Sequence, residues 1–253
     1  MAERLPDLTG QGWRTRRAPP MLTTMNRIAL TVLALAAPIA AFAAPKPVLR
    51  PVANPGGVIA AELGFASLAQ EKGQWTAFRA TAAKGAKMFA PQPVLVAEYL
   101  KGKKDPPVAV KWQPHGVWSS CDGSIAVTRG AWQRPGSVGY FITVWQRQKD
   151  GKYKWVLDQG DALARAEPEP DAIDGVVADC PARGRGDGPR GDRPGKAYAP
   201  MLLADPIAGE SNDHTLAWNT AVDAAGGRAF TLTLSKDGAM REVLHASVKP
   251  SAG

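Results

Sequence analysis

The sequence predicts an α+β domain followed by a small all-β segment. Three observations support this prediction. Apolar residues recur at spacings of three and four between residues 57 and 89, and they alternate with period two from Val108 onward. A Gly- and Pro-rich stretch then precedes a second alternating region near the C terminus. Helices that precede an antiparallel meander are typical of an α+β arrangement with the helices on one face of the sheet.

The first 43 residues are predicted to be an export signal preceded by an extension from an upstream start site, and neither is expected to be part of the fold. Arg27 precedes the apolar stretch 28–40, and residues 41–43 (AFA) have the small-x-small pattern of a signal peptidase site. We expect cleavage after Ala43, which leaves a periplasmic or secreted protein without a stable membrane span. An uncleaved anchor is the alternative. We interpret residues 1–20 as the start-site extension, since Met21 and Met25 could each serve as the first residue.

The charge of the chain argues against nucleic acid as a partner. The whole chain has 31 Lys and Arg against 23 Asp and Glu, a formal charge of +8. Residues 1–43 hold five Lys or Arg and two Asp or Glu, so the rest of the chain has a formal charge of +5, and its charges are spread along the sequence. A nucleic-acid-binding surface needs a concentrated basic face.

Residues 55–160 predict one compact domain that begins with helices. Apolar spacing indicates a helix over 57–72, ended by Gly73, and a second helical stretch over 75–89. A short helix or turn follows at 94–100. Period-two patterning then indicates strands at 108–112, 125–127, 130–132, 140–148 and 153–158, with a hairpin turn at 149–152.

The rest of the chain predicts a linker and a meander. Residues 161–212 have linker composition, with nine Gly or Pro between positions 181 and 200. Residues 213–248 carry three strand signals separated by Gly226-Gly227 and by the turn 236–238. Three strands without a helix make a thin domain, so we expect this meander to pack on the first domain.

Several motifs resemble the secreted bacterial branch of the SnoaL-like proteins, in the nuclear-transport-factor-2-like superfamily. The resemblance covers residues 55–160. The motifs that carry it are residues 88–93 (MFAPQP), 110–114 (VKWQP), 119–130, 140–151 (YFITVWQRQKDG) and 154–160 (KWVLDQG). It implies a cone-shaped, curved antiparallel sheet with the N-terminal helices on one face. It implies no particular chemistry, because the superfamily includes lyases, isomerases and many non-enzymes.

The resemblance also directs the search for an active site. Enzymes of the superfamily, such as ketosteroid isomerase and scytalone dehydratase, place an Asp or His base and a Tyr or Trp donor inside the cone. The candidates here are Glu62, His115, Asp122, Tyr99, Tyr140 and Trp118. Each has a structural alternative: Asp122 suits a turn before Gly123, His115 suits a loop, and Glu62 suits a solvated helix face.

Five Trp residues fall between positions 112 and 155, and they fill a core or line a pocket for an apolar, ring-shaped ligand. The predicted pocket residues are Trp112, Trp118, Trp132, Trp145 and Tyr140.

Cys121 and Cys180 predict a disulfide, because an export signal places them in an oxidising compartment. Sequences of the family that the chain resembles usually have glycine where Cys121 stands, which indicates a local constraint special to a subgroup. A free reactive thiol is the alternative. The three His residues show no ligand spacing, and no phosphate loop or nucleophile elbow occurs, so we expect neither a metal nor a cofactor.

Alternation assigns the residues of the central strand to two apolar faces. Tyr140, Ile142 and Val144 share one face, while residues 141, 143 and 145 share the other. The face that does not line the cone must be covered, and we expect residues 213–248 to cover it; homodimerisation is the alternative.

Two function classes follow. The first is a non-catalytic exported protein that binds a small apolar ligand or mediates an interaction. The alternative is a lyase or isomerase that transfers a proton inside the cone.

Overall fold

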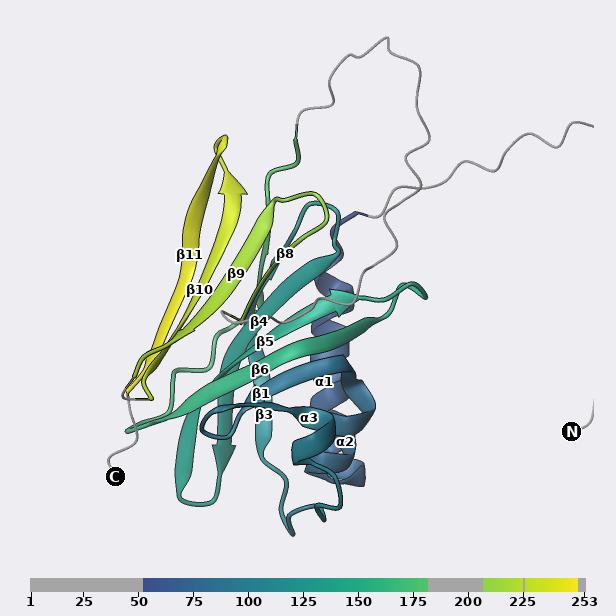
Figure 1. Cartoon of the computed structure of the whole chain (residues 1–253), viewed down its shortest axis with the longest axis vertical. Coiled ribbons are helices and arrows are strands. Elements are labelled where there is room, and N and C mark those ends of the chain that lie inside the picture. Colours follow the sequence, from purple (N-terminus) through teal and green to yellow (C-terminus); the bar gives the residue numbers. More distant parts are fainter. Residues whose placement is uncertain (1–51, 182–206, 225, 250–253) are drawn as a thin grey trace, which may run out of the picture. The chain divides into compact units, whose positions relative to one another are not determined.

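Two β-sheets and three helices make up the part of the chain that the structure describes (Figure 1). The structure is a computed structural model, and it describes residues 52–181, 207–224 and 226–249. The expected signal segment 1–43 and most of the Gly-, Pro- and Arg-rich stretch lie outside these ranges. All described residues belong to one compact unit.

The helices come first, and capping groups define their ends. Helix α1 (Pro55–Lys72) starts where the Asn54 side chain accepts a 2.9 Å hydrogen bond from the Gly57 N–H. It ends before Gly73, whose φ of 103° disfavours a side chain. Helix α2 (Gln74–Thr81) follows, and the Asp105 carboxylate accepts hydrogen bonds from the N–H and hydroxyl of Thr76 in its first turn. Helix α3 is the short segment Val96–Tyr99.

The first sheet has seven strands in the order β2-β1-β6-β5-β4-β3-β7. Strands β3 to β6 form the expected antiparallel meander, while β1 pairs parallel to β6 and β7 pairs parallel to β3. The strands are β1 (Ala82–Phe89), β2 (Pro93–Leu95), β3 (Lys111–Ser119), β4 (Ile125–Arg134), β5 (Ser137–Arg147), β6 (Tyr153–Leu163) and β7 (Asp174–Val177).

Two expectations about these elements are wrong. The second helical stretch ends at Thr81, and its expected second half, Ala82–Phe89, is strand β1. Pairing with β6 and β2 overrides the helical spacing there, and Gly85 (φ 80°) is incompatible with a regular helix. The expected linker contains two strands, β7 and β8, which pair with strands far away in sequence.

The second sheet contains β8 (Ile207–Glu210), β9 (Leu216–Val222), β10 (Arg228–Lys236) and β11 (Ala239–Val248), in the order β11-β10-β9-β8. We call the face of the first sheet that meets α1 and α2 the inner face, and the opposite one the outer face. The second sheet covers the outer face: Ile142 and Val144 share a core with Trp218, Phe230 and Leu232. This is the cover that the alternation predicted.

Two β-bulges decide which side chains reach the inner face. The register of β5 against β6 shifts so that Trp145 pairs with Trp155 while Val144 pairs with Leu157. The extra residue turns Leu157 outward and Asp158 inward. The register of β3 against β4 shifts at His115 in the same way.

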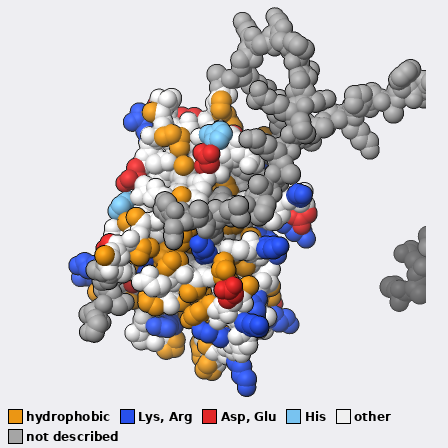
Figure 2. All heavy atoms as spheres, in the orientation of Figure 1, with side chains coloured by type: hydrophobic (Ala, Val, Ile, Leu, Met, Phe, Trp, Pro, Cys, Tyr) orange, Lys and Arg blue, Asp and Glu red, His pale blue; other side chains and the backbone are white. Residues whose placement is uncertain are grey.

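Cationic side chains are less evenly spread than the sequence indicates. Figure 2 shows Lys and Arg gathered over the part of the surface near α2, α3 and β1. The exposed cationic residues of these elements and of the loop after α3 include Arg79, Lys84, Lys101, Lys103 and Lys104. Within the described ranges, no helix has the length and apolar character that a membrane span requires.

Candidate ligand-binding site

A cavity of about 380 Å³ lies between the helices and the inner face of the first sheet. This volume is in the range of small-molecule binding sites. Residues of α1, α2, β1 and β3 to β6 contribute to its walls. Six of the lining side chains are aromatic: Phe65, Trp75, Phe78, Trp112, Trp132 and Phe141.

Contacts between these rings hold the walls of the cavity in place. Phe65 meets both Phe78 and Trp112 edge to face, with ring centroids 4.8 Å apart in each pair. Trp75 extends the cluster through an edge contact with Phe78 at 5.5 Å. Edge-to-face pairs of this kind favour one arrangement of the rings, so the aromatic walls are formed before any ligand enters.

Asp158 brings a carboxyl group to this aromatic cavity. The Thr143 hydroxyl donates a 2.9 Å hydrogen bond to Asp158 Oδ2. The other oxygen, Oδ1, has no hydrogen-bond partner among the described residues. Burial raises the pKa of Asp158 to about 7, and the negative charge of Glu62 adds to the rise, while the bond from Thr143 opposes it. A carboxyl group with this pKa exchanges its proton near neutral pH.

Glu62 lies behind the aromatic wall and is fully buried. Trp112 Nε1 donates to Glu62 Oε1 at 2.8 Å, while the Thr128 hydroxyl and Trp145 Nε1 donate to Oε2 at 2.6 and 3.0 Å. Burial raises the pKa of Glu62, and these donors offset part of the rise. Trp112 lines the cavity, and its hydrogen bond to Glu62 fixes the orientation of its indole ring in the cavity wall.

The Glu62 and Asp158 carboxyl groups are connected through a pair of threonines. Thr128 on β4 lies directly opposite Thr143 on β5. Thr128 bonds to Glu62, and Thr143 bonds to Asp158. The inner face therefore carries two coupled acids, of which Asp158 reaches the cavity.

The other candidate acid–base residues lie away from this cavity. Asp122 stabilises the turn between β3 and β4, where it accepts hydrogen bonds from Ser120 and Ser124. His115 occupies the bulge in β3, and its Nδ1 is 3.9 Å from Glu167. Tyr99 lies under the Lys103 ammonium group, 3.3 Å from the ring centroid.

The predicted pocket residues divide between the two faces of the sheet. Trp112 and Trp132 line the cavity, and Trp145 is buried behind it, against Glu62. Trp118 and Tyr140 contribute to the core on the outer face instead. The bulge at His115 turns Trp118 away from the face of Trp112, and alternation along β5 places Phe141, not Tyr140, at the cavity.

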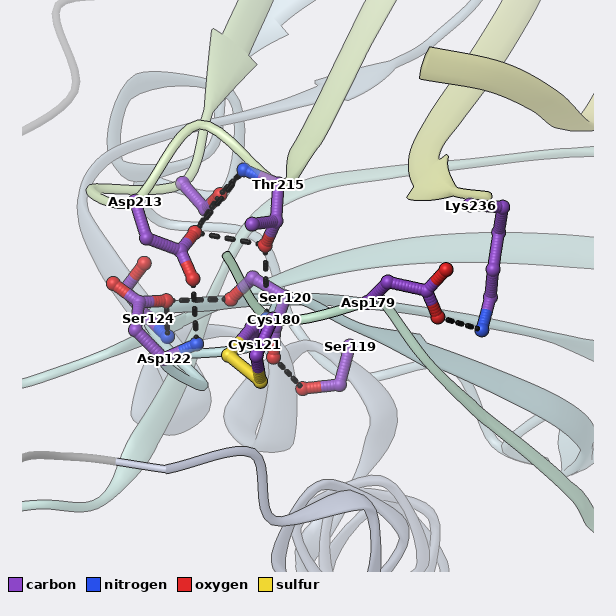
Figure 3. Close-up of a disulfide and its surroundings, with 11 residues drawn as sticks. Ser119, Ser120, Cys121, Asp122, Ser124, Asp179, Cys180, Asp213, Thr215 and Lys236 are labelled. Carbon is purple, nitrogen blue, oxygen red and sulfur yellow. Dashed lines mark hydrogen bonds and ion pairs between the residues drawn. A yellow bond between two sulfur atoms is a disulfide. The ribbon is translucent and has the colours of Figure 1, made fainter. Parts of the chain in front are cut away.

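Cys121 and Cys180 form a disulfide, as the sequence predicted, with their Cα atoms 5.1 Å apart (Figure 3). The bridge joins the turn after β3 to the segment that follows β7. It lies at the junction of the two sheets and does not contribute to the cavity. Within the described ranges, no three His, Cys, Asp or Glu side chains are grouped as metal ligands.

Comparisons with known proteins give likenesses to solved structures, with two proteins of the same description among them. No family model matches the chain, and no curated protein matches it. A solved structure from Parabacteroides distasonis, described as a "putative ketosteroid isomerase", matches with 15% identity and a TM-score of 0.35, over 46% of this chain and 98% of that one. A protein of the same description from Kribbella flavida matches with 15% identity and a TM-score of 0.32, over 47% of this chain and 86% of that one.

Proposed function

We propose that this protein binds a small, ring-containing apolar molecule in the cavity between its helices and its first sheet. The observation that carries the proposal is the cavity of about 380 Å³ with six aromatic side chains in its walls. A preformed apolar cavity with few polar groups is the usual form of a small-molecule site. Nothing about this role requires a chemical step.

A fluorescent probe tests binding directly. N-phenyl-1-naphthylamine is a neutral ring compound that emits strongly in apolar surroundings, and we expect it to bind. The Trp75→Ala variant removes one cavity wall without removing a hydrogen bond of that side chain, and we expect about tenfold weaker binding. Trp118→Ala is the matched control, because Trp118 contributes to the opposite face. Equal binding by both variants, or no binding by the natural chain, would contradict the proposal.

Proton transfer is the second candidate, and the pKa of Asp158 favours it. A general base works best when its pKa is near the working pH, and that of Asp158 is about 7. In this role the Asp158 carboxylate would take a proton from a carbon of the ligand. It would return this proton at another position, as in an isomerase, or keep it while the electron pair left on the ligand expels a leaving group from the adjacent carbon, as in a lyase.

The second candidate predicts an exchange reaction. A cyclic ketone in heavy water should gain deuterium next to its carbonyl, at a rate that rises as the pH passes 7. The Asp158→Asn variant should lose this exchange, while Asp171→Asn, an exposed position outside the cavity, should keep it. If the naphthylamine binds but no exchange occurs, the protein is a binding protein and not this kind of enzyme.

We also propose export to the periplasm or the medium. The residues 27–43 support it, and the disulfide suits an oxidising compartment. N-terminal sequencing of the protein from its native source should find Ala44 as the first residue. An intact Met1 or Met25 would contradict export by cleavage.

A further inference from the structure

We infer that the ligand of the aromatic cavity is a cation, of the class of alkyl or arylalkyl amines and quaternary ammonium compounds. The inference rests on the proposed function and narrows it, because it gives the ring-containing ligand of the same site a positively charged group beside its apolar part. It follows from two features of the cavity that occur together: walls made of aromatic rings, and a carboxyl oxygen that no side chain of the described residues satisfies.

The walls offer the ring faces and edges that cations and ring compounds contact. Three of the six rings are indoles, which attract a cation more strongly than the rings of Phe or Tyr. One wall already holds a cation of the chain itself: the Arg134 guanidinium lies over the Trp132 ring, 5.7 Å from its centroid. Since Arg134 is exposed, this contact lies at the rim and leaves the interior to a ligand.

The carboxyl group supplies the opposite charge. Asp158 Oδ2 accepts the hydrogen bond from Thr143, and Oδ1 remains for a ligand. A neutral apolar ligand would leave that oxygen buried without a partner, which costs free energy. A cationic group near Asp158 would stabilise the carboxylate against its burial through its charge, and a protonated amine would also donate a hydrogen bond to Oδ1.

The other charged groups around Asp158 have partners within the chain or lie at the rim, so Asp158 is the group that would pair with a cationic ligand. Glu62 is occupied by three donors behind the wall. Asp161, farther along β6, also lines the cavity, and it lies close enough to the Arg228 guanidinium to have a cationic partner within the chain. Arg134 is the cationic side chain among the described lining residues, and it is at the exposed rim.

A pair of isosteric probes tests the inference. Benzyltrimethylammonium and neopentylbenzene have the same shape and differ in the charge of one atom. Their affinities are measured by displacement of N-phenyl-1-naphthylamine. At pH 8.5 we expect the cation to bind at least tenfold more tightly than the hydrocarbon. At pH 5.5 the advantage should fall about tenfold, because Asp158 then carries a proton, while the hydrocarbon should bind equally at both values.

Two variants distinguish the effect of the Asp158 carboxylate on cation binding from the effect of the overall charge of the protein. Asp158→Asn should abolish the pH dependence of the preference, and Asp171→Asn should retain it. If the two probes bind equally at pH 8.5, the cation inference is wrong and the proposed binding function stands. If the naphthylamine itself does not bind, the proposed function fails with it. The pH dependence of the natural chain decides the question even if the Asp158 variant does not fold.

Discussion

The N–H of Cys121 donates a 2.9 Å hydrogen bond to the hydroxyl of Thr215, although 94 residues separate them. The next residue, Asp122, donates its N–H to Asp213 Oδ2 at 2.7 Å (Figure 3). On the other side of the bridge, Asp179 forms an ion pair with Lys236 of β10. The disulfide therefore joins two segments that each hold the second sheet against the first.

Removing the disulfide should lower the stability of the whole unit. The Cys121→Ala/Cys180→Ala double variant opens a loop of 59 residues, and we expect the free energy of unfolding to fall by about 4 kcal/mol. Urea denaturation measures the change. The natural chain under reducing conditions is the control, and it should match the variant. If both thiols of the unreduced protein react with an alkylating agent, the bridge is absent and the prediction fails.

The packing of the second sheet on the first should depend on the aromatic side chains that lie between the two sheets. Phe230 is 0% exposed in the core between the sheets, and Phe230→Ala should cost about 3–5 kcal/mol in unfolding free energy. Val222→Ala, in the neighbouring strand at a side chain that is 42% exposed, should cost less than about 0.5 kcal/mol. Equal, small losses in both variants would show that the second sheet does not protect the outer face of the first.

The sequence was sufficient for the elements whose pattern is local. The apolar face of α1, the β5–β6 hairpin and the strands β9 to β11 were predicted from periodicity and turn residues. Pairing with distant strands was not predictable. Residues 82–89 have spacing that suits a helix, yet they form β1 beside β6, and residues 174–177 form β7 beside β3. The free energy of such pairing comes from partners that no local window contains.

The candidate site was predictable only in part, for the same physical reason. Glu62 and Trp112 were named from the sequence, but Asp158 was not. Strict alternation from Trp155 would place Asp158 on the outer face, and only the bulge after Trp155 turns it toward the cavity. A carboxylate directly after the apolar run 155–157 was the one signal available in the sequence.

Glu62 should be necessary for the packing of the helices on the sheet. Glu62→Met keeps the length of the side chain but leaves the Trp112 indole N–H without its acceptor. Trp145 Nε1 and the Thr128 hydroxyl also lose Glu62, although each keeps a second acceptor, Thr128 Oγ1 at 3.0 Å and the Thr143 carbonyl at 3.4 Å. We expect a loss of about 1–3 kcal/mol, the cost of one buried donor left unpaired. Glu62→Gln keeps one acceptor oxygen and should cost less.

The control for the Glu62 variants is Glu71→Gln. Glu71 is exposed in the last turn of α1, and its change should leave the unfolding free energy within about 0.5 kcal/mol of the natural value. Urea denaturation of the variants gives the comparison. A Glu62→Met variant as stable as the natural chain would show that the three donors do not need this carboxyl group.

Asp158 should make the protein less stable as the pH rises from about 4 to 7. The pKa of its carboxyl group is about 7 in the folded protein, against 3.8 for an Asp side chain in water. The folded state therefore holds the proton more tightly than the unfolded state, so folding is favoured at low pH and loses free energy as the pH passes through this window. A difference of this size corresponds to at most about 4 kcal/mol. Because the side chain is partly open to the cavity, we expect about 1–2 kcal/mol.

The Asp158→Asn variant tests this dependence. It cannot ionise, and it can still accept the hydrogen bond from Thr143. Glu62 contributes a slope of the same sign in both proteins, so the difference between the two stability curves isolates Asp158. We expect the curves to coincide near pH 4 and to separate toward pH 8, with the variant more stable. Asp171→Asn, an exposed position, should follow the natural chain throughout. If the Asp158→Asn curve also runs parallel to that of the natural chain, Asp158 ionises as an ordinary carboxyl group, and its burial has no effect on its proton.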